Sequence, residues 1–219
     1  MRIRTTQVST GNFRRSLLLA VLFTVVIWLI WISAELCQHD LLQYGVFPGR
    51  YDALAGVLTA PLVHGSLSHL VSNSLPLLVM LTILFYIYPK SSLIVLITLY
   101  IGSGLIVWLI ARPAWHIGAS GLTHGLMFFL FTVGLLRRDA LSAVFAMTVF
   151  FLYGSMVWGI FPRDPGISFE YHLAGAVIGV LLAFILRNFD SKPEPERYDW
   201  QDEIEDDDIT GVDWREEEP

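Results

Sequence analysis

The sequence has few charged residues, and most of its acidic residues lie at one end. Only 16% of the 219 residues are charged, and 14 of the 20 acidic residues fall within positions 190–219. A typical soluble domain carries about 25% charged residues. Six apolar stretches before position 190 contain no Asp, Glu, Lys or Arg. These absences exclude an ordinary soluble globular domain and indicate a membrane domain followed by an acidic tail.

Two further shortages exclude other features. Cys37 is the only cysteine, so no disulfide bond can form within the chain. The sequence has no cluster of Lys and Arg of the kind that follows a phosphate backbone, and we expect no nucleic-acid partner.

The six apolar stretches have the length of membrane-spanning helices. They contain 16–22 residues each, close to the roughly 20 needed to cross a bilayer core of about 30 Å. A segment inside the bilayer must satisfy its own backbone hydrogen bonds, which favours helices over open strands. The stretches are Leu17–Ala34, His69–Tyr88, Ser92–Ala111, Ser120–Leu136, Ala140–Phe161 and Tyr171–Leu186.

The pattern therefore predicts an all-α, polytopic membrane protein with a six-helix bundle. We expect a cytoplasmic segment over residues 1–16, the membrane domain over 17–188 and a disordered cytoplasmic tail over 189–219. Eleven of the 14 Lys and Arg lie on the side of the two termini, and three lie on the other side. Positive residues accumulate on the cytoplasmic side, so both termini are predicted to be cytoplasmic.

Polar residues gather where three of these helices begin at the predicted outer face. His69 and Asn73 are four residues apart and share a helix face, and Ser120 and His172 each lie at a helix start. Gly121 and Gly125, and likewise Gly175 and Gly179, form small-xxx-small pairs that allow two helices to approach closely. We expect this approach to bring Ser120 to His172.

Such a pair has the chemistry of a serine protease. A serine hydroxyl is a weak nucleophile that needs an adjacent base, and His172 is placed to accept its proton. An oxyanion needs hydrogen-bond donors, which the side chains of Asn73 and His69 and the backbone N–H of Ser120 are expected to supply. The spans contain no carboxylate, so the expected catalytic unit is a dyad.

Three motifs in this order resemble the rhomboid family of intramembrane serine proteases. They are Gly118 to Gly121 around the serine, the series His64, His69 and Asn73, and His172 followed by Gly175 and Gly179. The resemblance implies a bundle with a water-filled cavity opening outward, a nucleophile at Ser120 and a base at His172. It places His69 and Asn73 on the oxyanion side and gives His64, Gly118 and Gly121 supporting roles.

The same resemblance implies transmembrane protein substrates, no metal, no cofactor and a bacterial inner (plasma) membrane. The family often has an aromatic residue four positions after the serine, where this chain has His124. A second ionisable ring beneath the pair is expected to affect His172. The oligomeric state is not predicted.

Other interpretations of the same residues exist. Ser120 alone fits a helix N-cap, His172 alone fits an interhelical hydrogen bond, and His116 fits an interfacial residue. The main functional alternative is an inactive rhomboid-like protein that binds membrane clients. A histidine-based metal site or transporter using His64, His69, His124 and His172 is a third reading, which the lack of intramembrane carboxylates disfavours.

Overall fold

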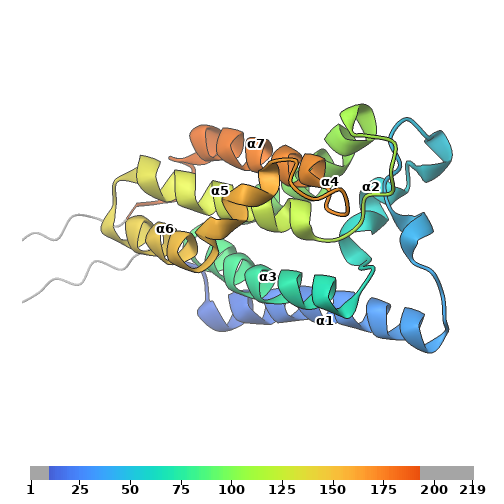
Figure 1. Cartoon of the computed structure of the whole chain (residues 1–219). Coiled ribbons are helices and arrows are strands. Elements are labelled where there is room, and N and C mark those ends of the chain that lie inside the picture. The colour runs from blue at the N-terminus through green and yellow to red at the C-terminus, as the bar shows by residue number, and fades with distance from the viewer. Residues whose placement is uncertain (1–9, 193–219) are drawn as a thin grey trace, which may run out of the picture.

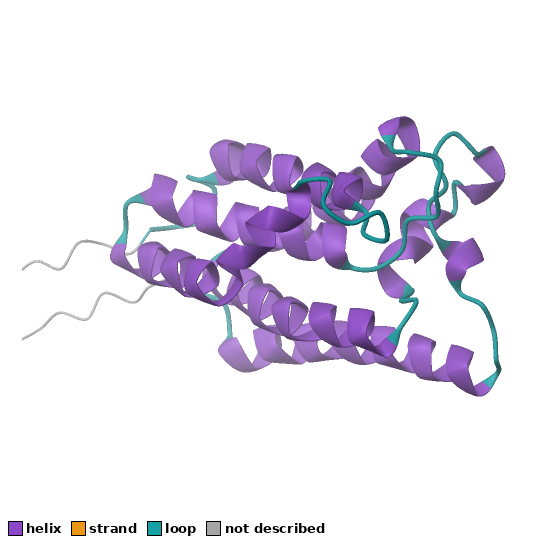
Figure 2. Cartoon of the chain, in the orientation of Figure 1, coloured by secondary structure: helices purple, strands orange, loops and turns teal. Residues whose placement is uncertain are grey.

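The computed structural model describes residues 10–192, and helices are the regular elements of this part of the chain (Figure 2). Six helical segments within residues 10–192 are long and apolar enough to cross a membrane. This confirms the predicted all-α, multi-pass membrane fold. The long helices are α1 (Phe13–Leu36), α3 (Leu67–Ile87), α4 (Ser92–Ile110), α5 (Ser120–Arg137), α6 (Ala140–Tyr153) and α7 (Phe169–Leu186).

The loop between α1 and α3 consists of short helical turns rather than an extended strand. They are η1 (Leu42–Tyr44), η2 (Tyr51–Ala53), α2 (Gly56–Thr59) and η3 (Ala60–Leu62). An isolated antiparallel bridge joins Val46 in this loop to His116, in the segment before α5. The loop is thereby tied to the chain that leads to Ser120.

Several helices begin earlier than hydrophobicity predicts because polar residues cap their first turns. α1 begins at Phe13 rather than Leu17, and Asn12 accepts a hydrogen bond from the Arg15 N–H at 3.1 Å. α7 begins at Phe169, where Ser168 accepts from the Tyr171 N–H at 3.2 Å. Each capping side chain binds a backbone N–H of the first helical turn, so the helix can begin before the apolar stretch does.

The fifth apolar stretch is not one continuous α-helix. α6 ends at Tyr153, and the chain continues as the narrower 3₁₀ helix η4 (Gly154–Ile160). Gly154 and Ser155 are poor α-helix formers, whereas the hydrophobicity of the stretch does not change there. This irregular segment matters because its carbonyl groups reach the site described below.

α5 and α7 pack directly on each other at the centre, with α4 against α7 and α6 against α5; α1 lies along α3 (Figure 1). A Cβ atom added at Gly175 would overlap the carbonyl oxygen of Gly121, and one at Gly179 would overlap that of Gly125. The two helix backbones are therefore in contact, as the small-xxx-small pairs predict.

The folded region continues past the predicted boundary at residue 188. Asp190 is 3% exposed and its carboxylate accepts hydrogen bonds from the backbone N–H groups of Lys90 at 2.7 Å and Ser91 at 3.2 Å. Arg137 donates to the carbonyl oxygen of Asp190 at 2.9 Å. The remainder of the predicted tail, 193–219, lies outside the described residues.

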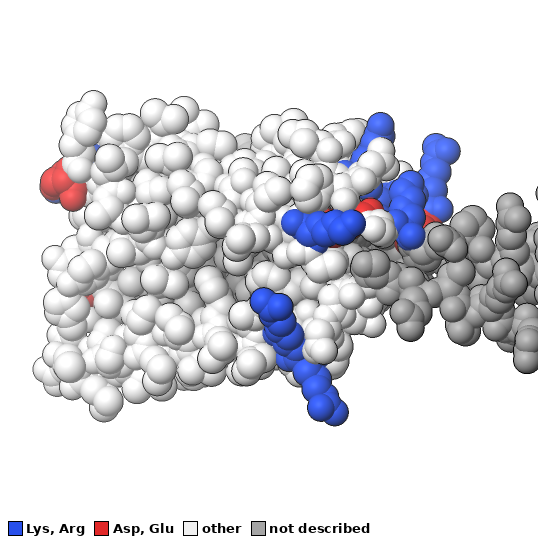
Figure 3. Space-filling view, turned by 180° about the vertical axis from the view of Figure 1, so that it is seen from behind, with Lys and Arg blue, Asp and Glu red and all other residues white. Residues whose placement is uncertain are grey.

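Charged side chains are concentrated at the ends of the molecule. Figure 3 shows Lys and Arg gathered toward one end, with a broad uncharged surface over most of the remainder. Arg14, Arg15 and Lys192, which are close in sequence to the two limits of the described region, are exposed. This is the asymmetry on which the predicted orientation depends.

Candidate active site

Ser120 is the first residue of α5, and its hydroxyl faces α7. The Ser120 Oγ lies 2.8 Å from Nε2 of His172. The N-cap position is occupied by Ala119, and no side chain caps the helix start. The interpretation of Ser120 as an N-cap is therefore wrong, because its hydroxyl is engaged with another helix.

The contacts of His172 determine where its ring proton lies. Nδ1 of His172 is 2.9 Å from the carbonyl oxygen of Gly159, in η4. A carbonyl can only accept, so Nδ1 carries the hydrogen, and the Nε2 lone pair faces the Ser120 hydroxyl. This is the tautomer that a general base needs. The sequence reasoning missed Gly159, because a backbone carbonyl leaves no signature in residue type.

The segment before Ser120 depends on the absence of a side chain at Gly118. This residue has φ +101°, a conformation that residues with a Cβ atom rarely adopt. A Cβ atom there would lie 2.5 Å from both Cε1 and Nε2 of His69. Gly118 thus allows the chain to turn into α5 and lets the His69 ring pack against that turn.

The expected oxyanion donors lie around the same cavity as Ser120. Asn73 is 4% exposed, and its Nδ2 donates one hydrogen to the His69 carbonyl at 3.0 Å, which leaves the second amide hydrogen available. The backbone N–H of Ser120 has no acceptor within residues 10–192. His69 also lines the cavity. The oxyanion role of the three groups remains a prediction.

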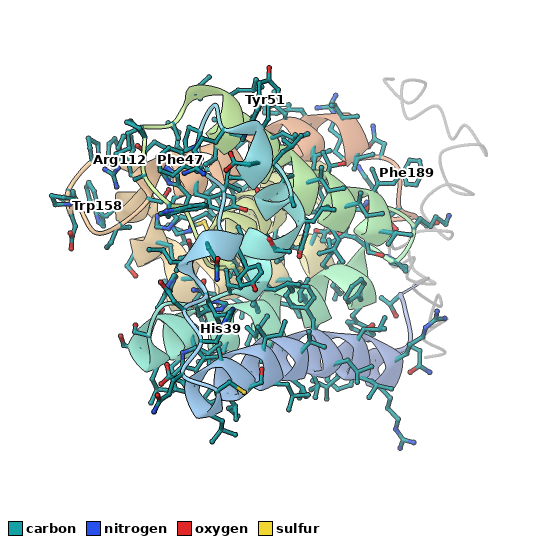
Figure 4. All side chains as sticks on the ribbon, turned by 90° about the vertical axis from the view of Figure 1, so that its right-hand side faces the viewer. His39, Phe47, Tyr51, Arg112, Trp158 and Phe189 are labelled. Atoms are coloured by element: carbon teal, nitrogen blue, oxygen red, sulfur yellow. The ribbon has the colours of Figure 1, made fainter. Side chains whose placement is uncertain are left out.

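The cavity has a volume of about 980 Å³ and reaches both members of the pair. Residues from α3, α5, η4 and α7 line it, together with the loop from Pro165 to Ser168. Figure 4 looks onto the end of the molecule that faces right in Figure 1, with Phe47, Arg112 and Trp158 together at the upper left; of these, Arg112 lines the cavity. Ser120 and His172 therefore share one large space between the helices.

His64 lies in the loop before α3 and supports the serine segment from behind. It is 2% exposed, and its Nε2 accepts a hydrogen bond from the Ala119 N–H at 3.4 Å. Its ring centroid is 5.0 Å from that of His69. Burial, with a smaller contribution from His69, lowers the pKa of His64 to about 3. His64 is therefore neutral at ordinary pH.

This pKa predicts an acid-sensitive fold. The unfolded His64 titrates near 6.5 and the folded one near 3, so unfolding takes up a proton and stability falls as the pH drops below 6.5. We expect His64 to account for a loss of about 2 kcal/mol between pH 7 and pH 5. His64→Gln should remove this part of the pH dependence of the unfolding free energy, measured in mixed micelles. An unchanged slope in the variant would contradict the assignment.

His124 lies directly beneath His172. The two rings are stacked, with centroids 3.8 Å apart and planes inclined by 7°. Nδ1 of His124 is 2.7 Å from the carbonyl oxygen of Ser120, and Nε2 is 3.1 Å from that of Met156. The sequence expectation that a second imidazole lies next to the pair matches this geometry.

The interpretation of His116 as an interfacial residue is wrong. It is 1% exposed, and burial lowers its pKa. Its Nδ1 contacts the Ser168 hydroxyl at 2.6 Å and its Nε2 the Arg112 carbonyl at 3.1 Å. Since Ser168 caps α7, His116 helps to fix the helix start that carries His172. Hydrophobicity alone could not predict this, because the contact joins two loops.

Arg112 holds the loop beside the cavity. One terminal nitrogen donates to the carbonyl oxygens of Pro165 at 2.9 Å and Ile167 at 2.8 Å. Its Nε lies 3.5 Å from a carboxylate oxygen of Glu170. Within residues 10–192, His, Cys, Asp and Glu side chains form no group of three suited to a metal ion.

The architecture and the site define a multi-pass membrane protein with a serine–histidine pair facing a large cavity between its helices. The Rhomboid domain matches residues 52–189, more than half of the chain. The chain therefore belongs to the rhomboid family, which is a family of intramembrane proteases.

Relatives come from mycobacteria. The uncharacterized protein Rv1337 of Mycobacterium tuberculosis is 34% identical over 173 residues, which cover 75% of this chain and 72% of the relative. The uncharacterized protein ML1171 of Mycobacterium leprae is 33% identical over 173 residues, which cover 75% of this chain and 68% of the relative. These relatives are consistent with a bacterial member of the family.

Proposed function

We propose that this protein is an intramembrane serine endopeptidase in which Ser120 is the nucleophile and His172 the general base. The observation that carries the proposal is the 2.8 Å contact between Ser120 Oγ and His172 Nε2. The Gly159 carbonyl supports it, because it holds the His172 proton on the other ring nitrogen. In this role the carbonyl takes the place that a carboxylate occupies in a triad.

The chemical steps follow from these contacts. Ser120 Oγ forms a bond to the carbonyl carbon of the substrate while its proton passes to His172 Nε2, and the carbonyl oxygen becomes an oxyanion. The C–N bond then breaks, and His172 returns the proton to the leaving amine. Water hydrolyses the acyl-enzyme by the same proton path. The Ser120 N–H, Asn73 and His69 are the proposed oxyanion donors.

The substrates in this proposal are transmembrane segments of other membrane proteins, reached through the lipid bilayer. The surface between the charged ends is uncharged over a wide area (Figure 3), which suits lateral contact with lipid and apolar helices. The excess of Lys and Arg on the side of the termini supports cytoplasmic termini in a bacterial inner membrane, with the cavity opening to the outer side.

The proposal is tested by cleavage in proteoliposomes. The purified protein is mixed with single-span test substrates that carry small residues near the outer end of the span. We expect cleavage by the parent and none by Ser120→Ala prepared in the same way. Cleavage that persists in Ser120→Ala would contradict the assignment of the nucleophile. A folded parent that cleaves no substrate and reacts with no serine-directed reagent would instead support the inactive, client-binding alternative.

A further inference from the structure

The stacked rings of His124 and His172 are enclosed by three helical segments. His124 is 5% exposed and His172 is 8% exposed. A Cβ atom at Gly159 would lie 2.7 Å from His124 Nε2 and 3.0 Å from His172 Nδ1, so the backbone of η4 rests directly on the pair. A positive charge on either ring therefore lies within a few ångströms of the other ring.

The four ring nitrogens face more acceptors than two neutral rings can serve. Three of them face carbonyl oxygens: His172 Nδ1 faces Gly159, and the two nitrogens of His124 face Ser120 and Met156. A carbonyl cannot donate, and a neutral imidazole has a single N–H. Two neutral rings thus satisfy two of these three contacts, whereas one additional proton satisfies all three.

The additional proton fits His124 better than His172. The fourth nitrogen, Nε2 of His172, already faces the hydroxyl of Ser120, which can donate to it. Both nitrogens of His124 face groups that only accept. The doubly protonated form of His124 is therefore the one that matches its surroundings.

We propose that His124 is a positioning residue whose protonation fastens η4 to α5 and keeps His172 from acting as a base, so that loss of this proton makes the site active. The inference rests on the proposed function of Ser120 and His172. It differs from a purely structural role for the stacked ring, because it requires a change of charge at His124.

Two physical effects connect the proton to activity. A positive charge on His124 lies against the ring that must itself become positive when Ser120 attacks, and like charges on two buried rings at this separation repel strongly. Neutral His124 has one N–H, which donates to the nearer carbonyl, that of Ser120 at 2.7 Å, so the ring donates nothing to the Met156 carbonyl. Of the two ring contacts of η4, the hydrogen bond from His172 Nδ1 to the Gly159 carbonyl then remains.

Other titratable or charged groups surround the pair on the neighbouring elements. Among them, Arg112 is matched by Glu170, whose carboxylate is 3.5 Å away, and η4 contributes no titratable side chain. Those that line the same cavity are His69 of α3, Tyr153 of α6, and Arg112 and His116 in the loop before α5. Glu170 and Tyr171 directly precede His172 on α7.

The test compares the pH dependence of kcat/KM between pH 5 and pH 9 in the parent and in His124→Phe. Phe retains a flat ring over His172 but has no nitrogen and no charge. We expect the acid-side midpoint of activity to move down by about one pH unit in the variant. Thr123→Val is the matched control, because Thr123 Oγ1 donates to the same Ser120 carbonyl at 3.0 Å but does not titrate. Its midpoint should equal that of the parent.

A midpoint in His124→Phe equal to that of the parent would overturn the inference, even if the rate fell at every pH. A second measurement needs neither the variant's stability nor any cleavage: ¹⁵N NMR of histidine-labelled parent, titrated from pH 8 downward. The first proton taken up by the pair should appear on His124, with both its nitrogens protonated. A first proton on His172 would overturn the inference. Absence of cleavage by the parent concerns only the proposed function.

Discussion

Replacing either Ser120 or His172 with Ala is expected to lower kcat/KM by about 10⁴-fold or more. The first substitution removes the nucleophile, and the second removes the acceptor located 2.8 Å from it. The two groups act on one proton, so the double variant should be no slower than the worse of the two single variants. The measurement is the initial rate of substrate cleavage in proteoliposomes of matched protein content.

Ser72→Ala is the matched control for this prediction. Ser72 also presents a hydroxyl in the cavity, but its Oγ donates to the His69 carbonyl of its own helix at 2.8 Å. Its removal should change the rate only a few-fold. If Ser72→Ala lost as much activity as Ser120→Ala, or if the effects of Ser120→Ala and His172→Ala multiplied, the dyad would be the wrong description.

Gly175→Ala is expected to have the second largest effect, a loss of about 10²-fold in cleavage with destabilisation of about 1–3 kcal/mol. A Cβ atom at this position would overlap the Gly121 carbonyl oxygen and lie 3.1 Å from the Gly125 nitrogen. These are backbone atoms, so α5 and α7 must move apart, and the contact between Ser120 and His172 lengthens. Ala has a higher helix propensity than Gly, so helix formation cannot explain a loss.

Gly102→Ala is the control for Gly175→Ala. A Cβ atom at Gly102 would meet Cδ1 of Ile178 at 3.0 Å, the mobile end of a side chain on α7. We expect little change in thermal stability and in cleavage from this variant. Parent-like cleavage by Gly175→Ala would show that the serine–histidine contact does not depend on the close approach of the two helices.

The six spans and the meeting of Ser120 with His172 could be predicted because each depends on residue type at a fixed spacing. Uncharged stretches of bilayer length predict the helices, and paired glycines predict the close approach of α5 and α7. Gly118 stands out in the sequence as a glycine two residues before Ser120. The structure gives the reason, since its φ of +101° favours a residue without a side chain.

The remaining features depend on long-range contacts that cannot be inferred from the type of a residue. The carbonyl groups of Met156 and Gly159 belong to η4, whose start after Tyr153 is hidden inside a uniformly apolar stretch. His116 is buried by a contact between two loops, and Asp190 accepts a hydrogen bond from the backbone N–H of Ser91, just before α4, across 99 positions of sequence. Long-range contacts of polar side chains with backbone groups require the folded structure.

The central claim is most directly tested by reaction of the intact protein with a fluorophosphonate, followed by peptide mass spectrometry. Such a reagent forms a covalent bond with a serine only where an adjacent base activates the hydroxyl. We predict one adduct, on the peptide containing Ser120, and loss of this adduct in His172→Ala. An adduct on another serine, or equal labelling of Ser120 in His172→Ala, would contradict the proposed dyad.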